Sequence, residues 1–151
     1  MRIGVISDTH VKTLDELPAP IITALAGVDL IVHAGDFTER PVLEGLRRLG
    51  AMKAVCGNMD SAELKRTLPQ KELFIVNGKK IGLIHGWGAP WGIADRVREK
   101  FNDVDIIIFG HSHQTCNQYI GGSLLFNPGR ASDSFGLLTI GDEVRAEIIK
   151  V

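Results

Sequence analysis

The sequence predicts an α/β protein in which helices cover a mixed sheet or two packed sheets. In the first third of the chain, apolar runs rich in β-branched residues alternate with helix-like stretches, which is typical of parallel strands joined by right-handed crossovers. In the last third, short strands alternate with glycine-rich turn signals, which is typical of antiparallel pairs. Both patterns together indicate sheets that mix the two kinds of pairing.

The N-terminal part predicts three strands joined by two helices. A proline early in the second helix is well placed, because the N–H it lacks would have no partner in the first turn. A third helix is expected to begin at Ser61–Glu63, and Asp60 either caps it or orients a neighbouring group. The first five elements are expected, in order, at Ile3–Ser7, Pro20–Ala26, Asp29–Ala34, Pro41–Leu49 and Met52–Cys56.

The rest of the chain predicts a hairpin, one helix and further strands. Asn77-Gly78 is the strongest short hairpin signal and lies between Glu72–Val76 and Lys80–His85. A helix is expected at Ile93–Phe101, followed by a very apolar strand at Asp105–Phe109. Turns at Gly121-Gly122 and Gly141-Asp142 separate the last expected strands, which are Cys116–Ile120, Leu124–Asn127, Phe135–Ile140 and Val144–Val151.

Length and composition predict one globular domain over residues 1–151. Hydrophobic residues make up 44% of the chain and charged residues 23%, which excludes a disordered protein. The 17 basic and 18 acidic residues leave a net charge of -1, which argues against a protein that mainly binds nucleic acid or an anionic membrane. Without a signal-peptide-like start, a membrane-spanning run or a cysteine pair, the expected location is the cytoplasm, and Cys56 and Cys116 are expected to be buried small residues.

Polar residues with metal-binding chemistry follow five of the expected strands, and four of these five have a glycine next to the polar residue. In open α/β sheets, ligands bind outside the carboxyl ends of the strands, so we expect these side chains to meet. Asp, His and Asn together suit Mn, Fe, Co, Ni or Zn better than Ca or Mg. The five segments are Asp8-Thr9-His10, Gly35-Asp36, Gly57-Asn58, His85-Gly86 and Gly110-His111-Ser112-His113.

The number of candidate ligands indicates two metal ions. Seven ligands are too many for one tetrahedral ion, but they suit two ions that share a carboxylate. Paired ions can clamp the attacking and leaving oxygens of an in-line displacement at phosphorus, and they lower the pKa of a bound water toward about 7. The residues therefore favour a metal-dependent phosphoester hydrolase.

These segments, in this order, resemble the calcineurin-like metallophosphoesterases. The small size and the closing Asn127-Pro128-Gly129-Arg130 are similar to the compact prokaryotic phosphodiesterase branch. The resemblance spans nearly the whole chain and implies a four-layer α/β/β/α sandwich of two mixed sheets. It also implies two divalent transition metal ions, with Mn2+ expected first and Ni2+, Fe2+, Co2+ or Zn2+ as alternatives.

The resemblance implies a role for each strand-end residue. A hydroxide that bridges the two metals would attack phosphorus, and Asp36, Asn58 and His85 are the residues expected to take part in catalysis. The first metal would be held by Asp8, His10 and His113, the second by Asn58, His85 and His111, and Asp36 would bridge them.

One position departs from the family pattern. Many members have a histidine directly after the asparagine, and this histidine is thought to protonate the leaving oxygen or to stabilise the transition state. This chain has Met59 there, which can do neither. General acid catalysis typically contributes about 10²–10⁴-fold, so we expect good leaving groups to be favoured.

Several other residues have two open interpretations. His33 is either a hydrogen-bonded structural histidine or a residue that orients a ligand. Arg40, and less strongly Arg130, either neutralises substrate phosphate or is a solvated surface arginine. Trp87 and Trp91 either stack on an aromatic part of the substrate or pack in a loop or an oligomer contact.

The leading functional hypothesis is a phosphodiesterase that acts on a small-molecule phosphoester. The alternative is a non-catalytic interaction scaffold, because one subunit of the eukaryotic retromer coat resembles this fold. A nuclease is disfavoured, because no cluster of Lys and Arg with interleaved aromatics is present. No membrane or specific nucleic acid is expected as a partner, and a homo-oligomer is expected from the resemblance.

Overall fold

The computed structural model describes all 151 residues and contains ten strands, four α-helices and one short 3-10 helix. The strands are β1 (Arg2–Ile6), β2 (Leu30–His33), β3 (Met52–Ala54), β4 (Lys71–Val76), β5 (Lys79–Ile84), β6 (Ile106–Ile108), β7 (Cys116–Ile120), β8 (Ser123–Asn127), β9 (Ser134–Ile140) and β10 (Val144–Lys150). The helices are η1 (Leu14–Glu16), α1 (Ala19–Ala26), α2 (Arg40–Leu49), α3 (Ala62–Thr67) and α4 (Ile93–Arg98).

The strands form two mixed sheets of five strands each. The first sheet has the order β10-β9-β1-β2-β3, in which β1, β2 and β3 are parallel and the β9–β10 hairpin pairs antiparallel to β1. The second sheet has the order β4-β5-β6-β8-β7, with β5, β6 and β8 parallel and antiparallel strands at both edges. The prediction of parallel crossovers followed by hairpins is confirmed.

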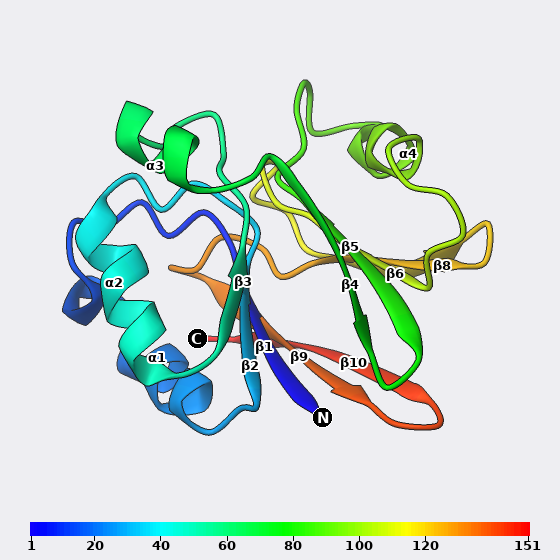
Figure 1. The fold of residues 1–151 in the computed structure, drawn as a ribbon, viewed down its shortest axis with the longest axis horizontal. Helices are drawn as coiled ribbons and strands as arrows, with labels where there is room; N and C mark the ends of the chain where they lie inside the picture. Colours follow the sequence, from blue (N-terminus) through cyan, green and yellow to red (C-terminus); the bar gives the residue numbers. More distant parts are fainter.

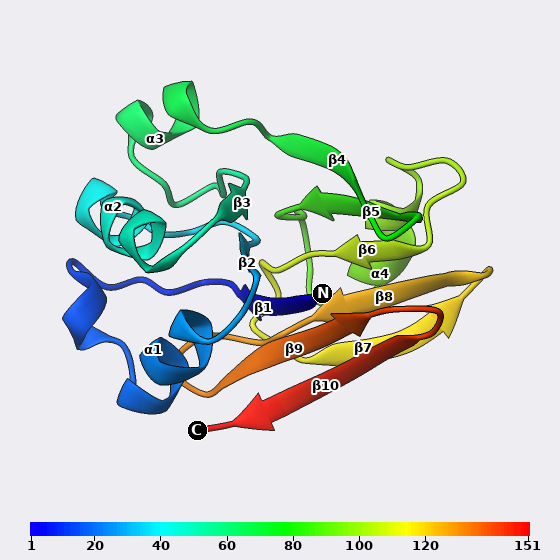
Figure 2. The ribbon, with the colours of Figure 1, turned by 60° about the horizontal axis from the view of Figure 1, so that its bottom comes forward.

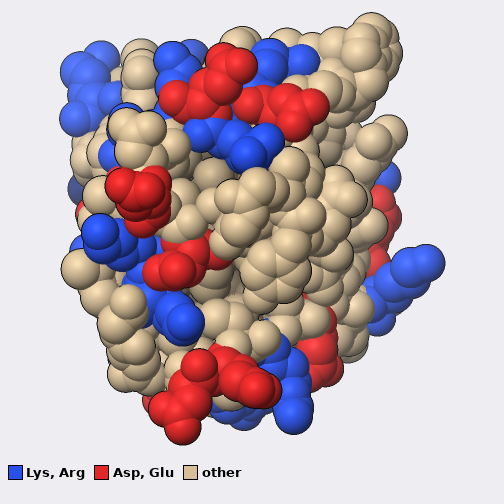
Figure 3. Space-filling view, turned by 90° about the vertical axis from the view of Figure 1, so that its right-hand side faces the viewer, with Lys and Arg blue, Asp and Glu red and all other residues tan.

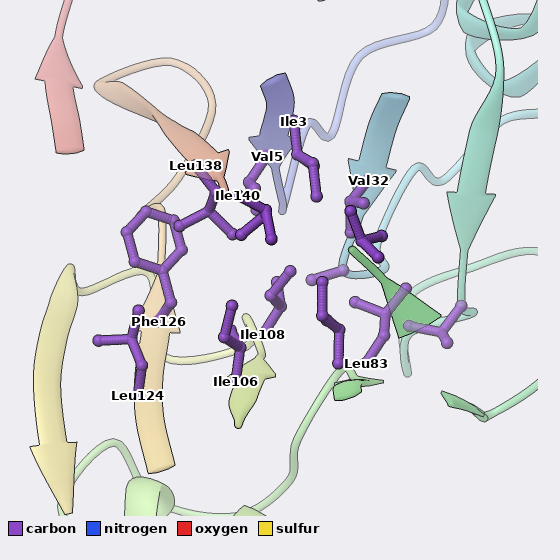
Figure 4. Close-up of a cluster of buried hydrophobic side chains, with 14 residues drawn as sticks. Ile3, Val5, Val32, Leu83, Ile106, Ile108, Leu124, Phe126, Leu138 and Ile140 are labelled. Atoms are coloured by element: carbon purple, nitrogen blue, oxygen red, sulfur yellow. The ribbon is translucent and has the colours of Figure 1, made fainter. Parts of the chain in front are cut away.

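The two sheets pack face to face, and helices cover the outer faces. Figures 1 and 2 show α1 and α2 together on the outer side of the first sheet and α4 beyond the second sheet. Buried aliphatic side chains from both sheets meet in the middle, among them Ile3 and Val5 from β1 and Ile106 and Ile108 from β6 (Figure 4). The predicted four-layer sandwich is therefore confirmed.

Alternation along the strands explains the layers. In β6 and the residue after it, Ile106 and Ile108 point between the sheets, whereas Ile107 and Phe109 point the other way and pack with α4. In β1, Ile6 likewise turns away from the central layer and joins the cluster beneath α1 and α2. An apolar strand buried on both faces is what these runs predict.

The helices α1 and α2 begin one residue earlier than expected, and three larger differences lie elsewhere. Helix α4 ends at Arg98 rather than at Phe101, because the next turn tightens: the N–H groups of Lys100 and Phe101 donate to carbonyls only three residues back. The short helix at Leu14–Glu16 was not predicted. At the start of α3, the Ser61 side chain accepts a hydrogen bond from Leu64 N–H, so Ser61 is the cap rather than Asp60.

Candidate metal centre

The seven predicted ligands lie together, on the loops that follow β1, β2, β3, β5 and β6. Five of them occupy the left-handed backbone region, with φ of 54° at Asp8, 48° at His10, 62° at Asp36, 70° at His111 and 61° at His113. Non-glycine residues rarely adopt this conformation, which costs about 1–3 kcal/mol each and concentrates at functional sites. The strained backbone is an indication of function that the sequence does not reveal.

Asp8 holds a buried carboxylate oxygen without a partner. Its Oδ2 accepts hydrogen bonds from Ser7 Oγ at 2.7 Å and from His111 N–H at 3.2 Å. Its Oδ1 has no hydrogen bond, and every other buried side-chain nitrogen or oxygen in the chain has a hydrogen-bond partner. The Nε2 atoms of His10 and His85 lie 3.9 Å from Oδ1, and that of His113 lies 3.4 Å away. A buried unpaired oxygen among imidazoles fits a bound cation.

The charges around Asp36 and His85 favour positive charge at the centre of this cluster. Asp36 Oδ2 lies 3.2 Å from His85 Nε2 and 3.7 Å from His10 Nε2. Burial alone lowers the pKa of His85, but the hydrogen bond and charge of Asp36 and the charge of Asp8 outweigh it, so this pKa is raised. Burial alone raises the pKa of Asp36, but His85 outweighs it, and the net pKa is lowered. A metal cation would supply the same positive charge and displace the proton.

The pKa of Asp8 is shifted in the opposite direction to that of Asp36. Burial raises the pKa of this carboxyl, and the positive charges of His85 and His113 and the hydrogen bond from Ser7 only partly oppose it. A carboxylate withdrawn from water in this way is costly unless a cation compensates it. The donor set and its electrostatics therefore fit divalent metal ions.

Two histidines are held in the tautomer that leaves one nitrogen free for a metal. His85 Nδ1–H donates to the carbonyl of Ala34 at 2.7 Å, and His111 Nε2–H donates to the carbonyl of Gly88 at 2.9 Å. The other nitrogens, His85 Nε2 and His111 Nδ1, lie 3.1 and 3.2 Å from Asn58 Oδ1. Backbone carbonyls commonly fix metal-binding histidines in this manner.

Two overlapping groups have the spacing of metal ligands. Within each group, one ligand atom per residue lies within 4.8 Å of the others; the groups are Asp8, His10 and His113, and Asp8, Asp36 and His85. Asp8 is thus common to both groups, whereas the family resemblance implies that Asp36 is the shared carboxylate. Asp36 also faces both sides, because its Oδ2 lies between His10 and His85.

Asp60 and Asn127 hold the loops that carry these residues. Asp60 Oδ2 accepts from the N–H groups of Gly57 and Asp36, at 2.7 and 3.1 Å, and its Oδ1 accepts from Thr38 N–H at 2.8 Å. Of the two interpretations of Asp60, the structure therefore favours orientation of a neighbour. The fully buried Asn127 donates to the Gly110 carbonyl and accepts from Gly129 N–H, a role that no local sequence pattern indicates.

His33 connects the first two of these loops. Its Nδ1 accepts from Gly35 N–H at 3.0 Å, its Nε2 lies 3.2 Å from Thr9 Oγ1, and its ring stacks on Phe37. Full burial lowers the pKa of His33 well below its ordinary value, so the ring is neutral. His33 is a structural histidine whose hydrogen bonds reach Gly35, next to Asp36, and Thr9, between Asp8 and His10.

Two glycines allow the loops to approach each other. A Cβ at Gly57 would lie 2.1 Å from Asp36 Oδ1, and a Cβ at Gly110 would lie 2.0 Å from Ser7 Oγ and 2.9 Å from Asp8 Oδ2. No side chain fits at either position without displacing a candidate ligand. Both glycines belong to the strand-end segments in which the candidate ligands were predicted.

Ion pairs decide between the open interpretations of two arginines, and two apolar side chains nearby are exposed. Arg40 is paired with Glu44 and Glu63, and Arg130 with Asp133, which supports the view that both are surface arginines. Met59 is 59% exposed, while its N–H donates to Asp36 Oδ1. Trp91 is 80% exposed.

Charges on the remaining surface are mixed. On the face shown in Figure 3, Lys and Arg alternate with Asp and Glu around a largely uncharged centre. None of the helices combines the length and the hydropathy that crossing a bilayer requires.

Comparison with known proteins places the chain in a family. Residues 1–141 match the calcineurin-like phosphoesterase superfamily domain. A probable metallophosphoesterase of Methanocaldococcus jannaschii is 36% identical, in an alignment that covers 100% of this chain and 82% of that protein. A phosphodiesterase of the same organism is 28% identical, over 93% of this chain and 91% of its own. The structure of Vps29 from Entamoeba histolytica in complex with zinc is 27% identical and has a TM-score of 0.77, with 99% of both chains covered. The chain therefore belongs to the calcineurin-like phosphoesterase superfamily.

Proposed function

We propose that the protein is a binuclear metal-dependent phosphodiesterase. The observation that carries this proposal is the unpartnered, buried Asp8 Oδ1 with three imidazole nitrogens within 3.9 Å of it. The family and the relative named as a phosphodiesterase support the same reaction class.

The residues divide into two sets of donors. Asp8, His10 and His113 would hold one ion, and Asn58, His85 and His111 the other, with Asp36 shared between them. When bound, two divalent transition metal ions activate a water and polarise the phosphoryl oxygens. The protein contributes donors whose orientation is set in advance by the carbonyls of Ala34 and Gly88 and by Asp60.

Departure of the leaving group has little help from this site. Met59, at the position of the family's usual histidine, has no proton to donate, and its side chain is exposed. The neutral His33 is fully buried and stacked on Phe37, so it does not reach the substrate. Esters with acidic leaving groups, such as p-nitrophenyl diesters, are therefore the expected good substrates.

Metal content and hydrolysis test this function together. After reconstitution with Mn2+, elemental analysis should find two ions per chain, and bis(p-nitrophenyl) phosphate should be hydrolysed until a chelator is added. Asp36→Ala should lose both metal and activity, whereas Asp142→Ala, an exposed carboxylate in the β9–β10 turn, should keep both. One ion at saturation, or full metal content in Asp36→Ala, would contradict a binuclear site.

A scaffold is the second candidate function. The similarity to Vps29 motivates it, together with exposed apolar side chains on the two outer strands of the second sheet: Leu73 and Ile75 on β4 and Tyr119 on β7. A protein that binds two metals fully but hydrolyses no aryl phosphoester, diester or monoester, would favour this candidate.

A further inference from the structure

A cavity of about 440 Å³ opens beside the candidate metal centre, with Asn58 and His85 in its wall. Its size lies toward the small end of the ~300–1,000 Å³ range of small-molecule pockets, so it can hold a substituent of a small phosphodiester. Lys65, Lys100, Gln70 and Trp87 also line it, and no Asp or Glu does. The charged side chains that line this cavity beside the candidate ligands Asn58 and His85 are thus the basic Lys65 and Lys100.

The two lysines come from separate parts of the fold. Lys65 belongs to α3 and Lys100 follows α4, and these helices lie on either side of the upper edge of the molecule in Figure 1. Neither ammonium group forms an ion pair, although four of the chain's other basic residues do: Arg40, Lys53, Arg98 and Arg130. Their positive charge is therefore available to a ligand.

The position of Lys100 is supported from two directions. Its Nζ lies 5.2 Å from the centroid of the Trp87 ring, a cation–π distance, so the ring orients the ammonium group without neutralising it. Its carbonyl accepts a hydrogen bond from Lys71 Nζ at 3.1 Å. One face of Trp87 is thereby occupied by a cation, which gives this tryptophan a role other than stacking on an aromatic substrate.

We propose that this cavity is a subsite for a second anionic group of the substrate. The inference rests on the proposed phosphodiesterase function: the scissile phosphate lies at the metals, and Lys65 and Lys100 bind a carboxylate or a further phosphate on one of its two substituents. The substrate class is then a small phosphodiester with an additional negative charge on one of its two substituents.

The expected preference is modest because both lysines are exposed. A solvent-exposed ion pair changes affinity by about 2- to 5-fold, so two lysines should give about tenfold, decreasing with salt. Substitution by glutamine removes the charge and keeps the helix propensity of Lys65.

Titration of the Mn2+-reconstituted protein with four phosphonates of similar length measures this preference. 3-Phosphonopropionate carries a carboxylate, propylphosphonate carries no second charge, and 3-aminopropylphosphonate carries an ammonium; propane-1,3-diphosphonate tests a second phosphate-like group. We expect the two anionic probes to bind about tenfold more tightly than propylphosphonate and 3-aminopropylphosphonate to bind most weakly. The affinities of the probes should become nearly equal in the double variant Lys65→Gln/Lys100→Gln. The differences should persist in Lys79→Gln, which alters a lysine at the β4–β5 turn. The stronger of the two anionic probes identifies the group.

Equal affinities in the wild type, no measurable binding, or a preference that survives in Lys65→Gln/Lys100→Gln would overturn the proposal. Hydrolysis of methyl p-nitrophenyl phosphate, which has no second charge, separates this result from the proposed function. If this ester is hydrolysed but the charge preference is absent, only the subsite is wrong. If the preference is present but no ester is hydrolysed, the subsite stands and the phosphodiesterase function fails.

Discussion

Replacement of Asp60 by alanine should destabilise the protein more than loss of any exposed carboxylate. Asp60 is 5% exposed and accepts three backbone hydrogen bonds, from Gly57, Asp36 and Thr38, at 2.7–3.1 Å. Hydrogen bonds to a charged group contribute about 1.5–3 kcal/mol each, and they are not additive. Because water can reach part of this loop, we expect Asp60→Ala to lower the free energy of unfolding by about 3–5 kcal/mol.

Asp60→Asn should give an intermediate loss. An asparagine keeps the shape but offers a single acceptor oxygen, so at least one of the three N–H groups would face its NH2 group. We expect this variant to lose about 1–3 kcal/mol, the penalty for one unsatisfied buried donor.

Urea unfolding in the presence of a chelator measures these changes without a contribution from bound metal. Asp142→Ala is the matched control, because its carboxylate is exposed and has no hydrogen bond; it should stay within about 0.5 kcal/mol of the wild type. If Asp60→Ala unfolds at the same urea concentration as Asp142→Ala, the three hydrogen bonds do not hold the loops, and our account of Asp60 is wrong.

Three further predictions follow from single residues. Gly57→Ala should disturb Asp36 and lower metal affinity at least tenfold by calorimetric titration, while Gly50→Ala, which meets no neighbour, should leave it unchanged; equal affinities would refute the steric argument. In the presence of a chelator, the free energy of unfolding should fall as the pH drops below about 6.5, because His33 binds a proton in the unfolded chain but stays neutral when buried. Over this pH range the free energy of unfolding of His33→Gln should therefore decrease less steeply than that of the wild type, by up to about 1.4 kcal/mol per pH unit. Parallel pH profiles of the two proteins would contradict this. Met59→His should raise the rate with alkyl relative to aryl diesters at least several-fold, because a general acid helps poor leaving groups most; identical leaving-group slopes in the two proteins would show that another group already donates the proton.

The strands and the strand-end residues were accessible to sequence reasoning because both depend on local patterns. Alternation and β-branched runs predict β1, β2 and β6 closely, and glycines next to Asp, His or Asn mark where these strands end. All seven predicted ligands lie close together, as expected from parallel strands that end at one edge. Their roles as ligands stay a prediction.

The supporting contacts could not be predicted, because they depend on the backbone conformation and on long-range packing. The sequence does not indicate that Asp8 or His111 has a left-handed φ, because non-glycine residues rarely adopt this conformation and are not expected to do so. Gly88, whose carbonyl fixes the tautomer of His111, is 23 residues away in the chain. Lys65 and Lys100 line one cavity only because the fold brings α3 and the turn after α4, which are far apart in the sequence, to its two sides.

The strained loops and the unpaired Asp8 oxygen together explain why this part of the molecule is so densely hydrogen bonded. Left-handed conformations at five candidate ligands cost about 1–3 kcal/mol each, a large share of the ~5–15 kcal/mol net stability of a typical domain. Asp60, Asn127 and His33 offset this cost through hydrogen bonds to the backbone of the same loops. A metal that binds only the native state adds stability by mass action, whereas these three residues hold the donors in place without it. Residues beside the candidate ligands therefore offset the conformational cost of the site. Variants of these neighbours should lower the free energy of unfolding even in the presence of a chelator, because their contribution does not depend on bound metal.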